Sequence, residues 1–279
     1  MATFMDNLKF KQYLPLGLLS FTSAVFVYLL LFFVGHYAYL YFAYDFDIGA
    51  FFDFNGIYFD IERSNPLWTY DATVSIILAR PLVSLVIGVI SLLAITLIKE
   101  IPMVFYFLLL WLNVFAFNAA FGLFITDFIT QSGVYFVAES MELGIIVMIF
   151  SLVVSSYLMY RLGKVNTMVY LNIIPQENSS QYSGRLKIVV ITIFIPWLLT
   201  AILMTLLSYI VNNYSIEHLN ILSAIFLLIP FLFCRCSRTT NNNNKQIEIK
   251  SFEWVIAVLL IMFSVLLYVK MLSPLTIMA

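Results

Sequence analysis

The sequence predicts an all-α polytopic membrane protein with about seven transmembrane helices and one β-hairpin between the first two. Of its 279 residues, 63% are hydrophobic and only 10% are charged, which is far outside the range of soluble domains. Several apolar runs reach the roughly 20 residues that span about 30 Å of hydrocarbon. The net charge of −1 argues against nucleic acid as a partner, because nucleic-acid binding favours a concentrated basic face.

Seven apolar runs have the character of membrane spans. They cover 15–43, 74–98, 102–126, 141–161, 187–211, 219–234 and 254–273, and the sixth is the shortest. The apolar run that follows the basic N-terminal segment is too long for a signal peptide, so we expect a retained first span. We expect a single multi-pass domain over 1–279. Four helices and an outer hairpin (48–63) fill 1–163, an inner linker covers 164–186, and three helices fill 187–279.

The placement of lysine and arginine tests this count independently, because cytoplasmic connections carry an excess of both. If the N-terminus is inside, the even-numbered connections are inside too. They hold Lys99, Arg161, Lys164, Arg185, Lys187, Arg235, Arg238, Lys245 and Lys250. The opposite side receives only Arg63 and Lys270, and it collects most of the acids, including Glu217. The sequence therefore predicts a plasma (inner) membrane protein with a cytoplasmic N-terminus and an external C-terminus.

The first outer connection carries a strong hairpin signal, Asn55-Gly56, because both residues of a type I′ turn need positive φ. A two-residue turn there pairs Phe54 with Ile57, Phe52 with Phe59, and Ala50 with Ile61. We expect this apolar face to lie on the outer membrane interface and to contact partner proteins. The candidate interaction residues are Phe52, Phe54, Ile57, Phe59 and Ile61. The alternative is an irregular aromatic loop.

Polar residues at membrane depth form the second focus, because burying them is costly and they usually face a bundle interior or a wet cavity. The candidate intramembrane cluster consists of His36, Arg80, Asn118, Asp127, Glu139 and Glu142. Arg80 requires a partner at its depth, and we expect Asp127 or Glu142 to supply it. Three roles stay open for Arg80: a clamp between helices, a lipid-facing side chain that reaches the interface, and a substrate or ion site.

Catalytic signatures do not emerge from the sequence. It contains no G-x-S-x-G motif and no phosphate-binding glycine loop. The pair Cys234 and Cys236 supplies two ligands, whereas a structural zinc site needs four. We therefore predict no catalytic residues, no metal site and no cofactor.

The order of features in 20–165 resembles the core of the site-2-type intramembrane metalloproteases. That family has a helix with H-E-x-x-H, then β-structure, a helix with a Gly-Pro-rich stretch, and a helix whose Asn and Asp-Gly complete the zinc site. The matching pieces here are 35–40 around His36, the Asn55-Gly56 hairpin, 79–85 around Arg80, and the stretch from Asn118 through Asp127 to Gly133.

The chain departs from this pattern at the residues that would perform hydrolysis. Tyr37 stands where the family has its general-base Glu, Leu40 replaces the second zinc-binding His, and Asp127 is not followed by glycine. One His and one Asp do not make a catalytic zinc site with three protein ligands. The resemblance therefore implies a degenerate, non-proteolytic relative.

Three functional hypotheses follow. The first is a non-hydrolytic scaffold or accessory subunit that binds other membrane proteins through its hairpin and helix faces, with the lipid bilayer around it. The second is a transporter or channel component with an outer-facing polar path around Arg80. The third is an intramembrane metalloprotease-like protein with relocated ligands.

Overall fold

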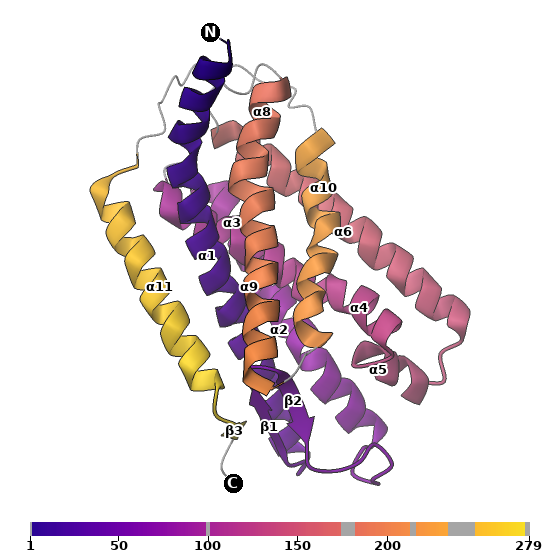
Figure 1. Ribbon diagram of the computed structural model, residues 1–279. Helices are drawn as coiled ribbons and strands as arrows, with labels where there is room; N and C mark the ends of the chain where they lie inside the picture. The colour runs from indigo at the N-terminus through magenta and orange to yellow at the C-terminus, as the bar shows by residue number, and fades with distance from the viewer. Residues whose placement is uncertain (1, 99–100, 174–181, 213–215, 234–248, 277–279) are drawn as a thin grey trace.

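A computed structural model describes residues 2–98, 101–173, 182–212, 216–233 and 249–276 (Figure 1). Its α-helices are α1 (Ala2–Asp45), α2 (Tyr70–Leu97), α3 (Met103–Phe117), α4 (Leu123–Thr130), α5 (Val134–Ser140), α6 (Ile145–Ile173), α8 (Tyr182–Val189), α9 (Ile195–Asn212), α10 (Ile225–Phe233) and α11 (Ser251–Met271). Two π-helical turns, η1 (Asn118–Gly122) and η2 (Val190–Phe194), and one 3-10 helix, η3 (Ile216–Ala224), connect some of them. The strands are β1 (Ala50–Asp53), β2 (Gly56–Phe59) and β3 (Leu275–Thr276).

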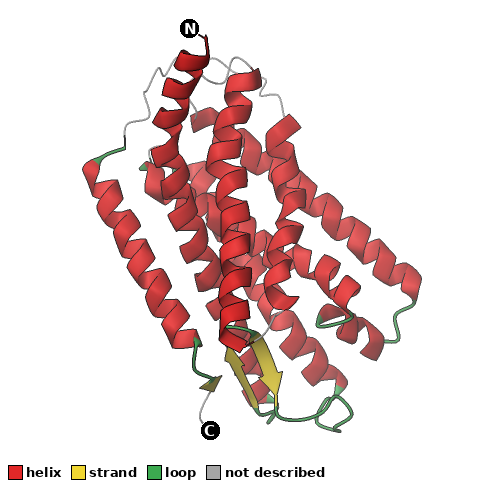
Figure 2. Cartoon of the chain, in the orientation of Figure 1, coloured by secondary structure: helices red, strands yellow, loops and turns green. Residues whose placement is uncertain are grey.

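The fold class that the sequence predicts is confirmed. Six of the described helical segments are long and apolar enough to cross a membrane: Tyr13–Asp45, Tyr70–Leu97, Met103–Thr130, Ile145–Leu171, Gly184–Val211 and Ser251–Met271. The helices run up and down the long axis of the bundle, so the first and last described segments lie at opposite ends (Figure 1). The small sheet lies at the lower end only (Figure 2).

The sixth predicted span corresponds to the shorter apolar helix Glu217–Phe233, and its unusual geometry compensates for its length. Its first half belongs to the 3-10 helix η3, and its second half is α10. A 3-10 helix rises about 2.0 Å per residue and an α-helix about 1.5 Å, so η3 and α10 together extend roughly 30 Å. The segment can therefore match a bilayer core with fewer residues than a regular α-helix needs.

Helix α1 forms the centre of the bundle. It packs against α2, α3, α9 and α11, and 61% of the residues in its 18-residue apolar window are buried. By contrast, only 11% of the residues in the corresponding window of α6 and 22% in that of α11 are buried, so these two helices lie at the periphery. Their apolar outer faces suit a surrounding bilayer, which is as apolar as the side chains themselves.

The hairpin forms, but its register differs from the predicted one. Strand β1 pairs with β2 so that Ala50 faces Phe59, Phe51 faces Tyr58, Phe52 faces Ile57, and Asp53 faces Gly56. The turn therefore occupies Phe54 and Asn55. Because the shift relative to the predicted pairs is an even number of residues, every side chain keeps its predicted face.

Local hydrogen bonds and burial explain this register. The Asn55 N–H donates to the Asp53 carboxylate at 2.7 Å, an Asx-type turn, while Gly56 adopts φ 141°. The side chain of Phe54 is fully buried beside the His218 and Tyr268 rings, which holds this residue in the turn instead of in the ladder. Packing of one aromatic side chain thus overrides the local preference for a type I′ turn.

The apolar face of the hairpin packs inward, against the helical bundle. Phe52 and Phe54 are fully buried in the main core. Phe59 and Ile61 are half-buried against a second, smaller core between the ends of α1 and α2, and Ile57 contacts both cores. Strand β3 adds a third, unpredicted strand beside β1, with Phe51 opposite Thr276 and Phe52 opposite Leu275. The hairpin is therefore part of the bundle's own packing.

The inner linker predicted over 164–186 is shorter at both ends, because α6 continues to Ile173 and α8 begins at Tyr182. The apolar residues at the end of α6, including Tyr170 and Leu171, are buried in the main core and extend the helix beyond the predicted span. The middle of this linker, 174–181, lies outside the described residues, as do Cys234 and Cys236.

Close packing of α6 on α10 generates the first prediction. A Cβ atom at Gly163 would collide with the backbone carbonyl of Leu227, which a side-chain rotation cannot relieve. We expect Gly163→Ala to lower the free energy of unfolding by about 1–2 kcal/mol, despite the better helix propensity of alanine. Denaturation in mixed micelles measures this free energy of unfolding. The matched control is Gly144→Ala, since a Cβ at Gly144 meets nothing within 4 Å. Equal stability of the two variants would contradict this packing.

Candidate functional site

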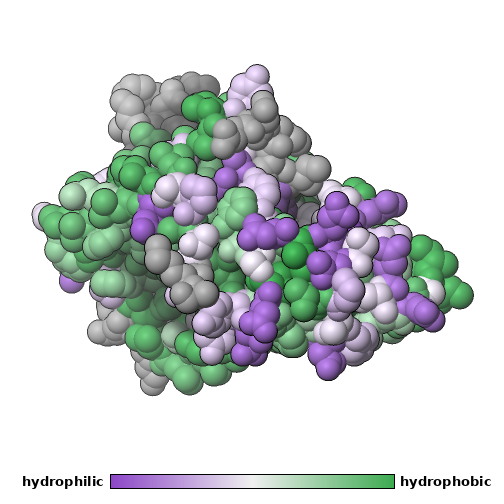
Figure 3. All heavy atoms as spheres, turned by 90° about the horizontal axis from the view of Figure 1, so that it is seen from below, coloured by the Kyte–Doolittle hydropathy of each residue, from purple (hydrophilic) through white to green (hydrophobic). Residues whose placement is uncertain are grey.

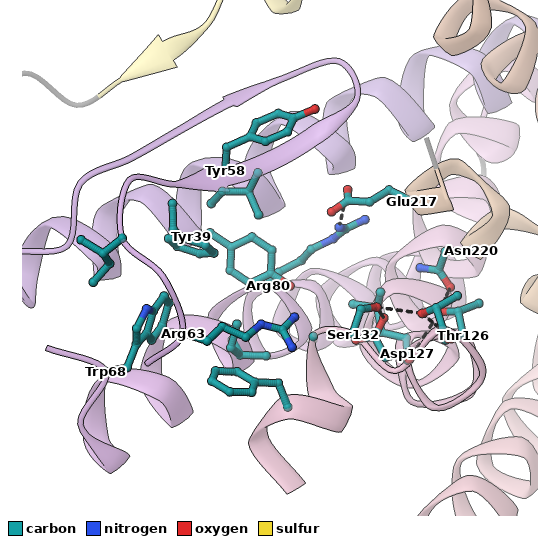
Figure 4. Close-up of a pocket in the computed structure, with 18 of the residues that line it drawn as sticks. Tyr39, Tyr58, Arg63, Trp68, Arg80, Thr126, Asp127, Ser132, Glu217 and Asn220 are labelled. Atoms are coloured by element: carbon teal, nitrogen blue, oxygen red, sulfur yellow. Dashed lines mark hydrogen bonds and ion pairs between the residues drawn. The ribbon is translucent and has the colours of Figure 1, made fainter. Parts of the chain in front are cut away.

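A cavity of about 800 Å³ lies where the hairpin, α2 and the short helices α4 and α5 meet (Figure 4). Hydrophilic side chains gather at this end of the molecule, with hydrophobic surface beside them (Figure 3). Its charged and polar lining residues are Tyr39, Tyr58, Asp60, Glu62, Arg63, Arg80, Thr126, Asp127, Thr130, Ser132, Glu217 and Asn220. Aromatic and aliphatic side chains, including Phe59, Trp68 and Phe136, complete the wall. Such a mixed wall is typical of small-molecule sites.

Arg80 reaches this cavity from the interior of α2. It is only 6% exposed, and its aliphatic part crosses α1 at Gly35, where a Cβ atom would lie 2.8 Å from Arg80 Cγ. The glycine therefore makes room for the side chain. The guanidinium donates from Nη1 to Glu217 Oε2 at 3.3 Å, and Tyr39 lies beside it (Figure 4). A buried guanidinium needs such a counter-ion, because an unpaired buried charge is costly.

His36 binds the same carboxylate from α1. Its Nδ1 lies 2.8 Å from the Phe32 carbonyl oxygen, and its Nε2 lies 2.7 Å from Glu217 Oε2. A carbonyl only accepts, so Nδ1 carries a proton and donates it. The short contact on the other side then also needs a proton, either on Nε2 or on the carboxyl group. In both cases His36, Arg80 and Glu217 together carry one net positive charge.

A layer of buried hydrogen bonds positions Glu217 by fixing the 3-10 helix η3. His218, the next residue, has its Nδ1 2.8 Å from Tyr28 Oη and its Nε2 2.8 Å from the Phe54 carbonyl oxygen. Since Nε2 must donate to this carbonyl, a neutral His218 accepts the Tyr28 hydroxyl proton at Nδ1. This single imidazole joins η3 to α1 and to the hairpin turn.

The π-helical turn η1 holds the other side of η3. Asn118 Nδ2 donates to the Asn220 carbonyl oxygen at 2.9 Å, and Ser223 Oγ donates to Asn118 Oδ1 at 2.8 Å. Gly122 permits this approach, because a Cβ there would collide with Ser223 Oγ. π-Helical turns within α-helices occur frequently at functional sites. Here the turn directs Asn118 toward the segment that carries Glu217.

Asp127 lines the cavity but acts as a helix cap. Its Oδ2 accepts the Val134 N–H at the start of α5 at 2.8 Å, and Ser132 lies at hydrogen-bond distance from Oδ1. The tight connection needs left-handed backbone at Gln131 (φ 54°) and at Gly133 (φ 45°). Asp127 therefore closes the α4–α5 turn by accepting one of the unpaired N–H groups of α5.

The structure places four of the six predicted cluster residues in the cavity wall or in the hydrogen-bond layer behind it. Arg80 and Asp127 line the cavity, His36 supports Glu217, and Asn118 supports η3. Glu139 and Glu142 are exposed instead, and Glu142 occupies a left-handed turn position (φ 53°). The ion-pair partner of Arg80 is Glu217, in place of the expected Asp127 or Glu142.

Glu217 carried a signal that the sequence-based search did not use. It stands two residues before the predicted sixth span, on the same outer side as Arg80. Asp127 and Glu139 flank predicted spans in the same way, so the criterion that selected them also selects Glu217 when it is applied to the sixth span. Three more polar residues, His218, Asn220 and Ser223, follow it within six positions and mark the polar start of a helix.

The residues of the protease resemblance are not collected into a ligand set. His36 faces Glu217, and Asp127 faces the start of α5. Tyr37, at the general-base position, is exposed on α1, and Leu40 is buried in the main core. Within the described residues, no group of three or more His, Cys, Asp or Glu side chains could hold a metal ion.

No protein-family model, curated protein or solved structure matches this chain.

A double-mutant cycle tests the ion pair at the centre of the site. We expect Arg80→Gln and Glu217→Gln to couple by about 1–3 kcal/mol in the free energy of unfolding. The lower half of this range is expected, because the Glu217 side chain is 32% exposed and solvent weakens the pair. The control cycle combines Arg80→Gln with Glu142→Gln, for which we expect coupling near zero. Chemical denaturation in mixed micelles measures both. Coupling of Arg80 to Glu142 and not to Glu217 would refute the pair.

Proposed function

We propose that this protein binds a small solute in the cavity around Arg80 and acts as a transporter or channel component of the plasma (inner) membrane. The observation that supports this proposal most directly is the cavity of about 800 Å³ lined by a buried Arg80–Glu217 pair. Ionisable groups at membrane depth usually mark substrate or ion pathways when they face a cavity. The clamp role of Arg80 and a solute role are compatible, because the same guanidinium joins α2 to η3 and faces the cavity.

The positive-inside rule supports an external position for the cavity. The cavity lies at the end of the bundle that carries the hairpin and β3, and the predicted external connections contain few basic residues. With this orientation the N-terminus is cytoplasmic and the C-terminus is outside. A solute from outside would then meet Asp60, Glu62 and Arg63 before it meets Arg80.

The scaffold hypothesis has less support. Two of its five hairpin residues, Phe52 and Phe54, are buried within the bundle, which leaves a smaller hairpin surface for a partner. The exposed apolar faces of α6 and α11 would remain for partner proteins, but lipid covers such faces equally well. A hydrolytic function has no support from the site, because His36 and Asp127 are each engaged in other contacts.

Cysteine accessibility tests this proposal without knowledge of the solute. In a background where Cys234 and Cys236 are replaced by serine, we expect Thr126→Cys to react with a membrane-impermeant methanethiosulfonate added outside intact cells. Thr126 lines the cavity, so a water-filled path should reach it. Mass spectrometry of the purified protein measures the labelled fraction.

The matched control is Ser91→Cys, because Ser91 is buried between α2 and α3, away from the cavity lining. We expect no labelling there. If Thr126→Cys reacts only in inverted membrane vesicles, the orientation is reversed. If it reacts from neither side, the cavity is closed to water and the proposed function fails.

A further inference from the structure

The contact between His36 and Glu217 exists only while a proton lies between them. His36 Nε2 lies 2.7 Å from Glu217 Oε2, and His36 Nδ1 donates to the Phe32 carbonyl oxygen. A neutral imidazole with its proton at Nδ1 has a lone pair at Nε2, and an ionised carboxylate also presents lone pairs. Two lone pairs at this distance repel each other. One proton, on either atom, therefore holds the contact together.

Cavity water can exchange this proton through Glu217. The Glu217 side chain is 32% exposed and lines the cavity, whereas the His36 side chain is fully buried. The rings of Phe32, Tyr39 and Phe52 surround the imidazole. A proton that enters or leaves the pair therefore passes the carboxylate and not the core of the bundle.

Arg80 offers Glu217 a second partner once the proton has left. Its guanidinium points at the carboxylate, with Nη1 3.3 Å from Oε2 (Figure 4). Charge-assisted hydrogen bonds are usually about 2.7–2.9 Å long, so this contact has room to shorten. Loss of the proton leaves a fully ionised carboxylate that the Nε2 lone pair repels and the guanidinium attracts. Both forces move Glu217 from His36 toward Arg80.

The hairpin limits how far Glu217 can move otherwise. Gly56 packs directly against the carboxyl group, because a Cβ atom there would lie 3.1 Å from Glu217 Cδ and 3.2 Å from Oε1. Behind Glu217, the hydrogen bonds of His218 fix the backbone of η3. The carboxylate is thus confined beside His36 and Arg80, and a small displacement is enough to exchange one partner for the other.

The remaining titratable groups around the pair leave few competing explanations for a change of charge. A tyrosine is neutral below about pH 9, and arginine stays charged. His218 has both ring nitrogens engaged, by the Tyr28 hydroxyl and the Phe54 carbonyl. Asp127 is the group that a control has to separate from Glu217. The groups that face the pair are Tyr28 and Tyr39 from α1, Tyr58 from β2, Arg80 from α2, Asp127 from α4 and His218 from η3.

From this geometry we infer that Glu217 and His36 form a binding site for one exchangeable proton on the cavity wall, and that release of this proton breaks their contact and leaves Glu217 to Arg80. His36, Glu217 and Arg80 together then change from one positive charge to zero, and the proton passes to cavity water. This inference rests on the proposed function, within which the proton is the ion that is coupled to the solute path.

The first test follows the two ring nitrogens of His36 by NMR of the full chain in nanodiscs, between about pH 5 and 9, where histidine changes charge. The chain has only two histidines, so ¹⁵N-histidine labelling with one His218→Gln spectrum assigns them. We expect the Nε2 resonance of His36 to move to that of an unprotonated nitrogen as the pH rises, while Nδ1 keeps its proton. A carboxyl infrared band that disappears at the same pH would place the proton on Glu217.

His218 is the internal control for this titration. Its contacts require the opposite tautomer, with the proton at Nε2, and we expect it to keep this tautomer throughout. In Glu217→Gln the response of His36 should vanish, because an imidazolium there would be a second buried cation beside Arg80 without a counter-ion. A His36 Nε2 resonance that does not respond to pH in the native protein, or a titration at Nδ1, would overturn the inference.

The second test measures the charge of the cavity wall at Thr126→Cys, in the background without Cys234 and Cys236. The quantity is the rate of anionic sulfonatoethyl methanethiosulfonate divided by that of cationic trimethylammonium-ethyl methanethiosulfonate. Both rates refer to one cysteine, so its own ionisation cancels. We expect this ratio to fall about two- to fourfold as the pH rises, the effect of one unit charge at roughly 10 Å in water.

Two controls isolate Glu217 in this measurement. Glu217→Gln should remove the fall, although Asp127 is present in both proteins, and the exposed Ser64→Cys should show no fall. If the ratio at Thr126→Cys does not change while His36 titrates, the proton is not coupled to the cavity, and the inference fails but solute binding stands. If Thr126→Cys is never labelled, the proposed function fails, and the NMR titration alone decides whether the proton site exists.

Discussion

The carboxylate of Glu217 is the interaction on which this end of the structure depends. One oxygen, Oε2, contacts His36 from α1 at 2.7 Å and Arg80 from α2 at 3.3 Å, and the acid itself belongs to η3, more than 130 residues further along the chain. Three segments that are remote in sequence therefore meet at one atom. Because the imidazole already donates at Nδ1, this meeting requires a shared proton, and its charge is positive whichever group holds it.

The irregular helices of the chain allow these three segments to meet at the Glu217 carboxylate. A regular α-helix from residue 216 onward would direct successive side chains around the helix every 100°, whereas a 3-10 helix aligns residues i and i+3 on one face. In η3 this alignment places Glu217, Asn220 and Ser223 on the side that meets α2 and η1. The π-helical turn at Asn118 provides the complementary partner. Both irregular segments have less favourable backbone hydrogen-bond geometry than a regular α-helix. The buried side-chain hydrogen bonds between them compensate for this loss.

Much of the architecture could be predicted from the sequence, because hydropathy and basic-residue placement are strong signals in membrane proteins. The helical class, the order of the spans and the hairpin near Asn55 all follow from them. The register of the hairpin could not be predicted from these signals, because Phe54 is held by tertiary contacts with His218 and Tyr268 that no local pattern reveals. Strand β3 was missed for a similar reason, since two residues after a long apolar helix carry no strand signal.

The candidate site shows the same division between local and non-local information. Arg80 and His36 could be selected because an ionisable side chain within an apolar run has few interpretations. Their common partner could be recognised only as one of several acids near a span end, because the proximity of Glu217 to Arg80 exists only when η3 is packed on η1. Asp127 was selected for its depth, yet the turn at Gln131 and Gly133 uses its oxygens for capping α5. An acid whose oxygens already cap a helix makes no direct ion pair with Arg80, and this is why Glu217 and not Asp127 is the ion-pair partner of Arg80.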